Sequence, residues 1–289
     1  MISRLRALGS PLCVGIDPHL DRVPTLFGPR GTAQAVEAFG CAIVERAAGR
    51  VAVVKPQIAF FEQLGWQGMR ALDTIVKRAR EAGLLVLLDA KRGDIGSTAE
   101  GYVAAYLAAD APIEVDAITL SPYLGLDTLE PFAAAAEANG RGLVVLSRTS
   151  NPGSGDLQDL AVEGTAVYER VAASLAPLCE RLRGPDTGWS SLGVVVGATW
   201  PEQHEAVRKQ LPNAFFLVPG YGAQGGGARD AVRGFVPGPS GLEGGVVSSS
   251  RAVLFPEAAA TDDLRRWERA IDDALARSID ALADAVQTG

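Results

Sequence analysis

Four charged residues stand out because they lie where apolar segments of the chain end. Lys55 closes the run VAVVK, Asp89 and Lys91 close the run LLVLLDAK, and Asp94 follows shortly after in the sequence DAKRGD. In an extended strand residues 89 and 91 point to the same side, so the Asp89 carboxylate would lie near the Lys91 ammonium and keep it charged. A salt-bridge cluster that only stabilises the fold is the alternative. Burying several charges together is costly, however, so this set favours a functional site.

Lysine is rare in this sequence, which makes the position of each lysine informative. Of 27 basic residues only four are lysine, namely Lys55, Lys77, Lys91 and Lys209. A general preference for arginine explains most of this imbalance. Lysine can nevertheless release a proton within reach of neutral pH when its surroundings favour the neutral amine, whereas arginine effectively cannot. Lys55 and Lys91 are therefore candidates for chemistry that needs a transferable proton.

A second polar feature follows the later apolar runs and suits an anion. The run FFLVPG leads into PGYGAQGGG over residues 219–227, and the run GVVSSSR ends at Arg251. Glycine allows backbone N–H groups to approach an anion closely, and arginine offers a bidentate charged partner. A flexible loop without a ligand is the alternative for the glycines alone. The glycines and the arginine occur together, and this favours a phosphate site.

Eight short apolar runs, rich in β-branched residues, recur along the whole chain. They are continuously apolar, as strands buried on both faces of a parallel sheet are. The predicted strands are residues 12–17, 51–55, 84–91, 115–120, 143–147, 192–198, 215–220 and 245–251.

Helical patterns alternate with these runs and define the expected fold. They cover residues 32–48, 66–82, 98–109, 126–138, 159–182 and 201–211, and a last helix begins after Thr261 as its expected N-cap. Eight strand–helix units in a chain of this length predict a (β/α)8 TIM barrel, with residues 1–289 as a single domain. A doubly wound open sheet is the competitor, but GIDPH after the first strand is not a dinucleotide-binding turn. Residues 183–191 and 234–245 are expected to be loop insertions.

Composition excludes several other classes of protein. The net charge is −7, which disfavours an extended nucleic-acid interface. No apolar run reaches the roughly 18–20 residues that span a bilayer, and no signal peptide is recognised, so we expect a cytoplasmic protein. The three cysteines are far apart, and the two histidines have no triad or metal-ligand partners at useful spacing. We therefore expect no metal site.

The charged strand ends match the pattern of a known family over nearly the whole chain. The spacing D-x-K-x-x-D-I-x-x-T, here from Asp89 to Thr98, resembles the signature of the orotidine 5′-phosphate decarboxylase family. The spellings LLDAKRGDIGSTAEGY and VKPQIAFFE resemble its longer bacterial branch. The resemblance implies a barrel homodimer that uses no metal and no organic cofactor. It also implies the last step of de novo pyrimidine nucleotide synthesis, in which orotidine 5′-phosphate becomes uridine 5′-phosphate.

The resemblance also implies a role for each matching residue. Lys55, Asp89, Lys91 and Asp94 would form the catalytic tetrad, and Asp94, Ile95 and Thr98 would reach the active site of the partner subunit. The remaining matches would bind the substrate: Asp17 and Lys55, with Asp94 and Thr98 of the partner chain, at the ribose; Ser150 at the pyrimidine; Gln224 and Arg251 at the phosphate.

The chemistry that the resemblance implies fits these residue types. Loss of CO₂ from C6 of orotate leaves a carbanion that has no conventional electron sink. A nearby ammonium can stabilise this charge and then protonate the carbon, so Lys91 is the expected proton donor. Asp89 would lie near the substrate carboxylate.

Two other functions remain open at this stage. Phosphosugar lyases of the same superfamily share D-x-K-x-x-D but use Mg²⁺ and tend to place a glutamate ligand at the end of the second strand. This chain has Lys55 there, and a cation disfavours metal binding. A catalytically inactive nucleotide-binding barrel is the other alternative, although a mere binder has little reason to keep so costly a charge cluster.

Chelation separates these alternatives. Because Lys55 stands where the lyases place a ligand, full decarboxylation of orotidine 5′-phosphate should survive exhaustive treatment with EDTA. The decrease in ultraviolet absorbance of the substrate measures the reaction. Activity that EDTA abolishes and Mg²⁺ restores would favour the phosphosugar lyase instead.

Overall fold

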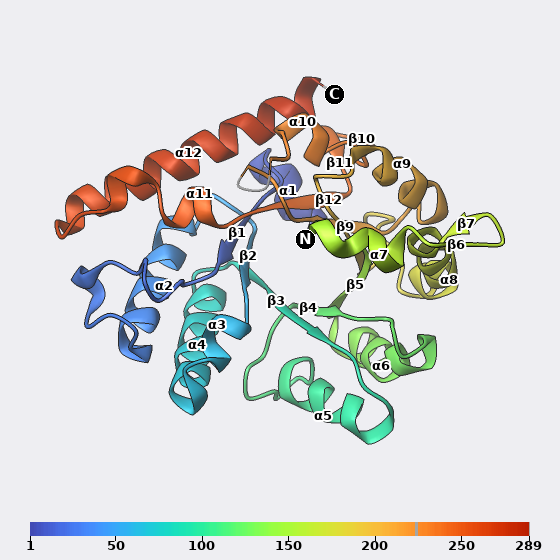
Figure 1. Ribbon diagram of the computed structural model, residues 1–289, viewed down its shortest axis with the longest axis horizontal. Helices are drawn as coiled ribbons and strands as arrows, with labels where there is room; N and C mark the ends of the chain where they lie inside the picture. The colour runs from blue at the N-terminus through green and yellow to red at the C-terminus, as the bar shows by residue number, and fades with distance from the viewer. Residues whose placement is uncertain (223–224, 289) are drawn as a thin grey trace.

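The computed structural model describes residues 1–222 and 225–288, and eight parallel strands in this part of the chain close into a barrel (Figure 1). Each predicted apolar run overlaps one of these strands, so the predicted (β/α)8 fold is confirmed. The order around the barrel is β1-β12-β9-β8-β5-β4-β3-β2. The strands are β1 (Leu12–Ile16), β2 (Val53–Pro56), β3 (Leu85–Arg92), β4 (Ala117–Leu120), β5 (Gly142–Arg148), β8 (Leu192–Val196), β9 (Phe215–Val218) and β12 (Gly245–Ser249).

Alternation along the strands places the charged residues inside the barrel mouth. Every barrel strand contributes an inward apolar side chain to one buried cluster, and successive inward positions are two residues apart. On β2, β3 and β4 the next inward positions after Val53, Leu87 and Ala117 are Lys55, Asp89 and Thr119. These polar side chains therefore lie directly above the buried apolar layer, at the mouth of the barrel.

Helices cover the outside of the barrel and bury an apolar face against the strands (Figure 1). The longer helices are α2 (Ala33–Ala47), α4 (Gly65–Glu81), α5 (Gly96–Tyr106), α6 (Glu130–Asn139), α8 (Val167–Arg181), α9 (Pro201–Gln210) and α12 (Leu264–Thr288). The shorter ones are α1 (Ile2–Leu8), α3 (Ala59–Glu62), α7 (Gly155–Gln158), α10 (Ala228–Ala231) and α11 (Arg251–Leu254). None of the helices in the described ranges has the length and apolar character needed to cross a membrane.

Several helix boundaries differ from the prediction, and two of the differences have a clear local cause. The helix expected over 159–182 begins only at Val167, because a hairpin of β6 (Ala161–Val162) and β7 (Thr165–Ala166) precedes it. The hairpin turns at Glu163 and Gly164, whose φ angles are 52° and 78°. The N-cap of α12 is Asp263 rather than Thr261, since Asp263 Oδ1 accepts a hydrogen bond of 2.9 Å from the Arg266 amide.

The two expected insertions lie at the face of the barrel opposite the strand ends that carry the charged residues. Both precede a barrel strand, and the second contains the hairpin of β10 (Val236–Gly238) and β11 (Gly241–Glu243). Glu243 accepts two hydrogen bonds of 2.7 Å from Arg6 of α1 and one of 2.9 Å from Trp189. Ile2 and Leu5 of α1 pack into the interior cluster. The insertions and α1 therefore close the far end of the barrel and leave the mouth free for a ligand.

Candidate active site

The carboxyl ends of the barrel strands surround a cavity of about 510 Å³. This is the end at which barrel enzymes carry their active sites. The residues predicted from the sequence that line it are Asp17, Lys55, Asp89, Lys91, Ser150 and Arg251.

Asp89 is the centre of the charged cluster, because each of its carboxylate oxygens binds a different lysine. Lys55 Nζ donates to Oδ2 at 2.9 Å, and Lys91 Nζ donates to Oδ1 at 2.6 Å. The Lys55 side chain is only 6% exposed, whereas that of Lys91 is 47% exposed. Lys55 is therefore a buried, fixed partner of Asp89, while Lys91 extends into the open part of the site.

These charges hold one another in the ionised state. Burial alone would raise the pKa of Asp89, but the ammonium groups of Lys55 and Lys91 outweigh burial and hold this pKa well below its ordinary value. Burial also acts to lower the pKa of Lys55, but the carboxylates of Asp89 and Asp17 raise it above its ordinary value. A lowered carboxyl pKa and a raised ammonium pKa keep Asp89 and Lys55 charged throughout the neutral range.

Lys91 reaches Asp89 through an irregular backbone and not through simple strand alternation. Its φ angle is 48°, in the left-handed region, and the register between β3 and β4 shifts between Leu88 and Arg92. The contact between residues 89 and 91 was expected, but the expected reason, a regular extended strand, is wrong. A lysine in this conformation costs on the order of 1–3 kcal/mol, so the surrounding structure must hold it there.

Thr119 on β4 provides this support. Its Oγ1 accepts hydrogen bonds from the amides of Ala90 at 2.9 Å and Lys91 at 2.8 Å, and donates to Asp89 Oδ1 at 3.1 Å. The threonine is fully buried. One hydroxyl thus satisfies two amides of the bulged segment and orients the central carboxylate. Sequence reasoning missed Thr119, whose only signal is a hydroxyl within the apolar strand VDAITL.

Asp17, just after β1, lies on the same cavity as the lysines. Its Oδ1 is buried and finds no hydrogen-bond partner among the residues that the structure describes. A buried acceptor without a donor is costly, so a hydroxyl supplied by a ligand would relieve this cost.

The segment after β3 does not turn into the cavity of its own chain. Asp94 Oδ1 accepts a hydrogen bond of 2.8 Å from the Ile95 amide, and Ile95 is 62% exposed. Thr98 is exposed on the first turn of α5. None of these three predicted residues lines the cavity.

The glycine-rich side of the cavity, where the sequence predicted a phosphate site, lies at β9 and β12. Pro219, Gly220, Tyr221 and Arg251 line it, and Arg251 begins the short helix α11. The φ angle of Gly220 is 93°, a conformation that favours glycine. Gln224, which the sequence assigned to the phosphate, lies outside the described residues.

Another side of the cavity is polar but uncharged. Thr149, Ser150, Asn151 and Gln158, from the segment between β5 and α8, line this side. The backbone at Ser150 approaches Gly197 so closely that a Cβ atom at position 197 would lie 2.8 Å from Ser150 Cα. Sequence reasoning assigned a role to Ser150 but none to Thr149, Asn151 or Gln158.

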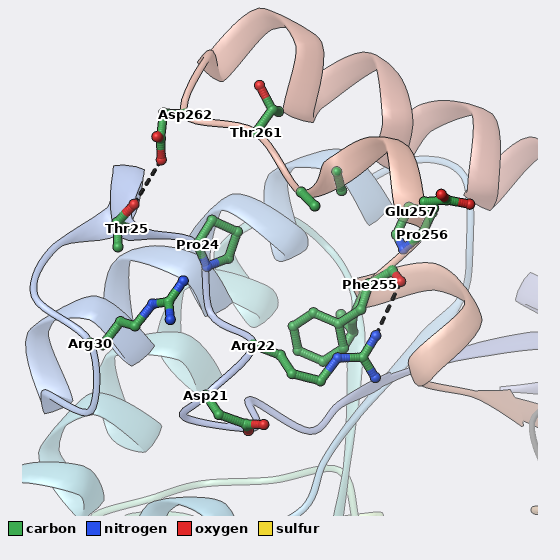
Figure 2. A pocket seen from close by; sticks show the side chains of 13 residues that line it. Asp21, Arg22, Pro24, Thr25, Arg30, Phe255, Pro256, Glu257, Thr261 and Asp262 are labelled. Carbon is green, nitrogen blue, oxygen red and sulfur yellow. Dashed lines mark hydrogen bonds between the residues drawn. The ribbon is translucent and has the colours of Figure 1, made fainter.

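A second cavity, of about 440 Å³, lies between the segment after β1 and the start of α12 (Figure 2). Arg22 donates to the Phe255 carbonyl at 3.3 Å and covers the Phe255 ring, and Thr25 donates to Asp262 at 2.7 Å. None of the described site residues lines this cavity. Its polar contacts therefore join two surface segments, and the charged cluster belongs to the first cavity alone.

Within the described ranges, no group of three or more histidine, cysteine or acidic side chains is placed to hold a metal ion. The cavity presents two ammonium groups beside its carboxylates. This donor set suits an anionic organic ligand.

Comparison with known proteins identifies relatives over most of the chain. Residues 10–260 match the sequence model of the orotidine 5′-phosphate decarboxylase / HUMPS family. The chain is 43% identical over 278 residues to orotidine 5′-phosphate decarboxylase of Rhodopirellula baltica, which covers 91% of both proteins.

Solved structures agree with the sequence comparison. A crystal structure of a candidate orotidine 5′-phosphate decarboxylase from Streptomyces avermitilis has a TM-score of 0.82 and 37% identity, covering 99% of this chain and 95% of the other. The structure of Leishmania donovani OMP decarboxylase has a TM-score of 0.75 and 31% identity, covering 97% and 95%.

Substitution of Thr119 tests how the cluster is built. Thr119→Val keeps the shape but leaves the buried Ala90 amide and the part-buried Lys91 amide without an acceptor, so the free energy of unfolding should fall by about 2–4 kcal/mol. Thr119→Ser retains the hydroxyl and should recover most of this loss. Denaturant unfolding of the two variants measures the difference. Equal stability of the valine and serine variants would show that the hydroxyl does not support the bulge.

Proposed function

The chain belongs to the orotidine 5′-phosphate decarboxylase family, and we propose that its reaction, conversion of orotidine 5′-phosphate to uridine 5′-phosphate, takes place at the charged cluster around Asp89. The observation that carries this proposal is the half-exposed Lys91 ammonium, which lies in the cavity and is bound to Asp89 at 2.6 Å.

Lys91 is the proton donor in this account. When the bond from C6 to the carboxylate breaks, CO₂ leaves and the electron pair stays on C6. The Lys91 ammonium stabilises this charge and transfers one proton to C6, which leaves a neutral amine. Because the side chain is 47% exposed, the amine can regain a proton from solvent. Lys55, at 6% exposure, has no such access, and it acts by holding Asp89 in place.

The rest of the cavity binds the other parts of the nucleotide. Asp17 and Lys55 bind ribose hydroxyls, and the unpaired Asp17 Oδ1 supports this assignment. Arg251 and the glycine-rich segment that begins at Gly220 bind the phosphate, together with Gln224. Ser150 binds the pyrimidine. The phosphate is remote from C6, so its binding energy also serves to position the ring.

A second copy of the chain completes the site. Asp94, Ile95 and Thr98 are turned away from their own cavity, and we assign them to the cavity of the partner subunit in a homodimer. The exposed apolar side chain of Ile95 follows β3, and Tyr123 and Leu124 follow the neighbouring strand β4 at 84% and 51% exposure. An apolar surface of this kind supports an interface between subunits.

The expected cellular context follows from the substrate and the cysteines. The partner molecule is a nucleotide and neither nucleic acid nor membrane. The free cysteines Cys13, Cys41 and Cys179 suit a reducing compartment, so we propose a cytoplasmic location.

Replacing Lys91 by arginine separates proton donation from charge. Arginine preserves the positive charge but does not readily give up a proton, since its pKa is above about 12. Lys91→Arg should therefore decarboxylate orotidine 5′-phosphate almost as slowly as Lys91→Ala. Lys77→Arg is the matched control, because Lys77 pairs with Asp73 on the outside of α4, and it should retain full activity. A near-normal kcat for Lys91→Arg would assign the proton to Lys55 or to a water molecule.

Mixing two inactive variants tests the shared site. Lys91→Ala and Asp94→Ala chains, each nearly inactive alone, should form heterodimers in which one site carries both changes and the other carries neither. Activity should then return to about half the normal value per heterodimer, as two-fold symmetry requires. Subunit exchange can be verified with differently tagged chains. An exchanged mixture that stays inactive would place Asp94 in the site of its own chain.

A further inference from the structure

The uncharged side of the cavity lies across the barrel mouth from Asp17. In the strand order β1-β12-β9-β8-β5-β4-β3-β2, strand β5 is four positions from β1 in either direction. Asp17 follows β1, and the segment Thr149–Asn151 follows β5. A ligand whose ribose lies at Asp17 therefore extends its far end toward residues 149–151.

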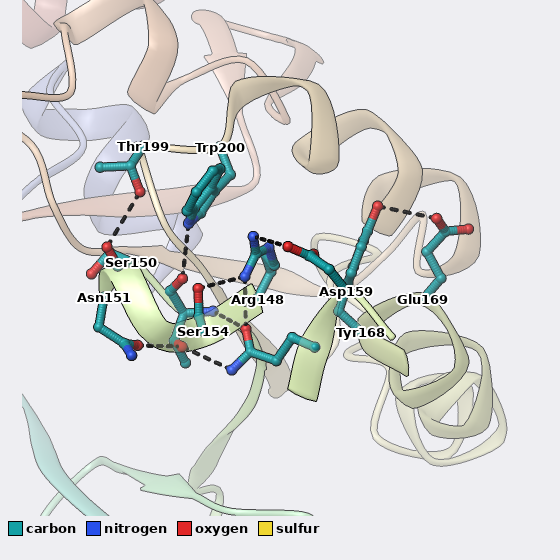
Figure 3. A network of polar contacts seen from close by, with 11 residues as sticks. Arg148, Ser150, Asn151, Ser154, Asp159, Tyr168, Glu169, Thr199 and Trp200 are labelled. Atoms are coloured by element: carbon teal, nitrogen blue, oxygen red, sulfur yellow. Dashed lines mark hydrogen bonds and ion pairs between the residues drawn. The ribbon is translucent and has the colours of Figure 1, made fainter. Parts of the chain in front are cut away.

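A buried arginine organises this side (Figure 3). Arg148, at the end of β5, is fully buried, and its guanidinium lies 4.3 Å from the centre of the Trp200 ring. Its Nη1 donates to Ser154 Oγ at 2.5 Å and to Gln158 Oε1 at 3.2 Å, while Nη2 donates to Asp159 at 3.0 Å. A guanidinium can only donate hydrogen bonds. Gln158 must therefore turn its carbonyl oxygen toward Arg148.

This constraint passes through Gln158 and Thr149 to Asn151. Gln158 Oε1 also accepts from the Thr149 amide at 2.9 Å, and its Nε2 donates to Thr149 Oγ1 at 2.8 Å. The Thr149 hydroxyl proton then points to Asn151 Oδ1, at 2.7 Å. Arg148 and the backbone amide can only donate, so each hydrogen bond from Arg148 through Gln158 and Thr149 to Asn151 has a fixed direction. The Asn151 amide group is thereby left with its N–H donors for a ligand.

The backbone of the segment is held as firmly as its side chains. Trp200 Nε1 donates to the Thr149 carbonyl at 3.0 Å, and the Thr199 hydroxyl lies 3.5 Å from the Ser150 carbonyl. Ser150 packs against Gly197, where a Cβ atom would clash with it, so glycine at position 197 allows the segment to lie close to β8. Asn151 is therefore presented at a fixed place on the cavity wall.

We propose that Asn151 is a specificity-determining residue that donates a hydrogen bond to the O4 carbonyl of the pyrimidine, with Arg148 as the positioning residue that fixes its direction. The inference rests on the proposed function, which places the ribose at Asp17. In the pyrimidine ring C4 lies opposite N1, the atom that carries the ribose, so O4 is directed toward the segment after β5. The site would then accept a carbonyl at C4 and disfavour an amino group.

Nucleotide binding tests this without relying on turnover. Uridine 5′-phosphate carries an acceptor at C4, whereas cytidine 5′-phosphate carries a donor there. Titration calorimetry should show that Asn151→Ala weakens the binding of uridine 5′-phosphate by roughly three- to tenfold, which corresponds to one hydrogen bond. The binding affinity for cytidine 5′-phosphate should be unchanged. Equal weakening of both nucleotides, or no change in either, would overturn the assignment of Asn151.

A variant at Gln158 tests the direction of these hydrogen bonds. In Gln158→Glu the carboxylate has only acceptors, so the Thr149 hydroxyl donates to it and Asn151 turns its carbonyl oxygen to the cavity. The preference for binding uridine 5′-phosphate over cytidine 5′-phosphate should fall by a similar factor. If Gln158 had only a structural role, its substitution would weaken the binding of both nucleotides alike. Leu157→Glu is the matched control, because it adds the same charge one position away at a 61% exposed site. The Leu157→Glu variant should show the same nucleotide preference as the unaltered protein.

The outcomes distinguish this inference from the proposed function. If the unaltered protein does not decarboxylate orotidine 5′-phosphate, the proposed function fails. If it does so and Gln158→Glu keeps the same nucleotide preference as Leu157→Glu, only the positioning role of Arg148 and Gln158 fails. A loss of the preference for uridine 5′-phosphate in both Asn151→Ala and Gln158→Glu supports the series of contacts from Arg148 to Asn151.

Discussion

The proposed active site depends on one buried carboxylate that binds two ammonium groups. Removing a charge from water is costly, and the cost is recovered only where its partners are close and well oriented. Asp89 meets this condition through Lys55, Lys91 and the Thr119 hydroxyl, all within about 3 Å. Loss of any one of these partners would leave charges or amides unsatisfied. The rigid barrel beneath the cluster supplies the fixed positions that the arrangement requires.

The different functions proposed for the two lysines follow from their different surroundings. Lys55 is enclosed by the barrel wall and serves as a constant counter-charge to Asp89. Lys91 stands on a strained, bulged backbone and reaches outward, where a proton can be exchanged with substrate and solvent. Strain of this kind persists only where neighbouring groups enforce it, and here Thr119 captures the two amides that the bulge displaces. A similar device operates across the mouth, where Arg148 fixes the direction of a chain of side-chain amides and hydroxyls.

The fold and the main charged residues could be predicted from the sequence for a simple physical reason. Strands buried on both faces must be apolar, so a lysine or aspartate at the end of such a run marks the barrel mouth. Features that depend on contacts between distant segments could not be predicted. The left-handed φ of Lys91 contradicts the local preference of lysine, and Thr119 acts only because β4 lies beside β3. Arg148 lies just beyond the predicted strand 143–147 and gave no signal, since its role depends on contacts with the segment that follows β5. The roles predicted for Asp94, Ile95 and Thr98 concern a second subunit, and these residues do not line the cavity of their own chain.

The most direct test of this account is the ionisation of the Lys55 side chain measured by nuclear magnetic resonance. The chain has only four lysines, so a spectrum of isotopically labelled lysine contains few signals, and Lys→Arg variants assign them. Lys55 should stay protonated above its ordinary pKa of 10.5, because the carboxylates of Asp89 and Asp17 outweigh burial. In Asp89→Asn the balance reverses, and Lys55 should lose its proton at a lower pH than in the unaltered protein. A Lys55 that titrates below its ordinary value in the unaltered protein would contradict the central role of Asp89.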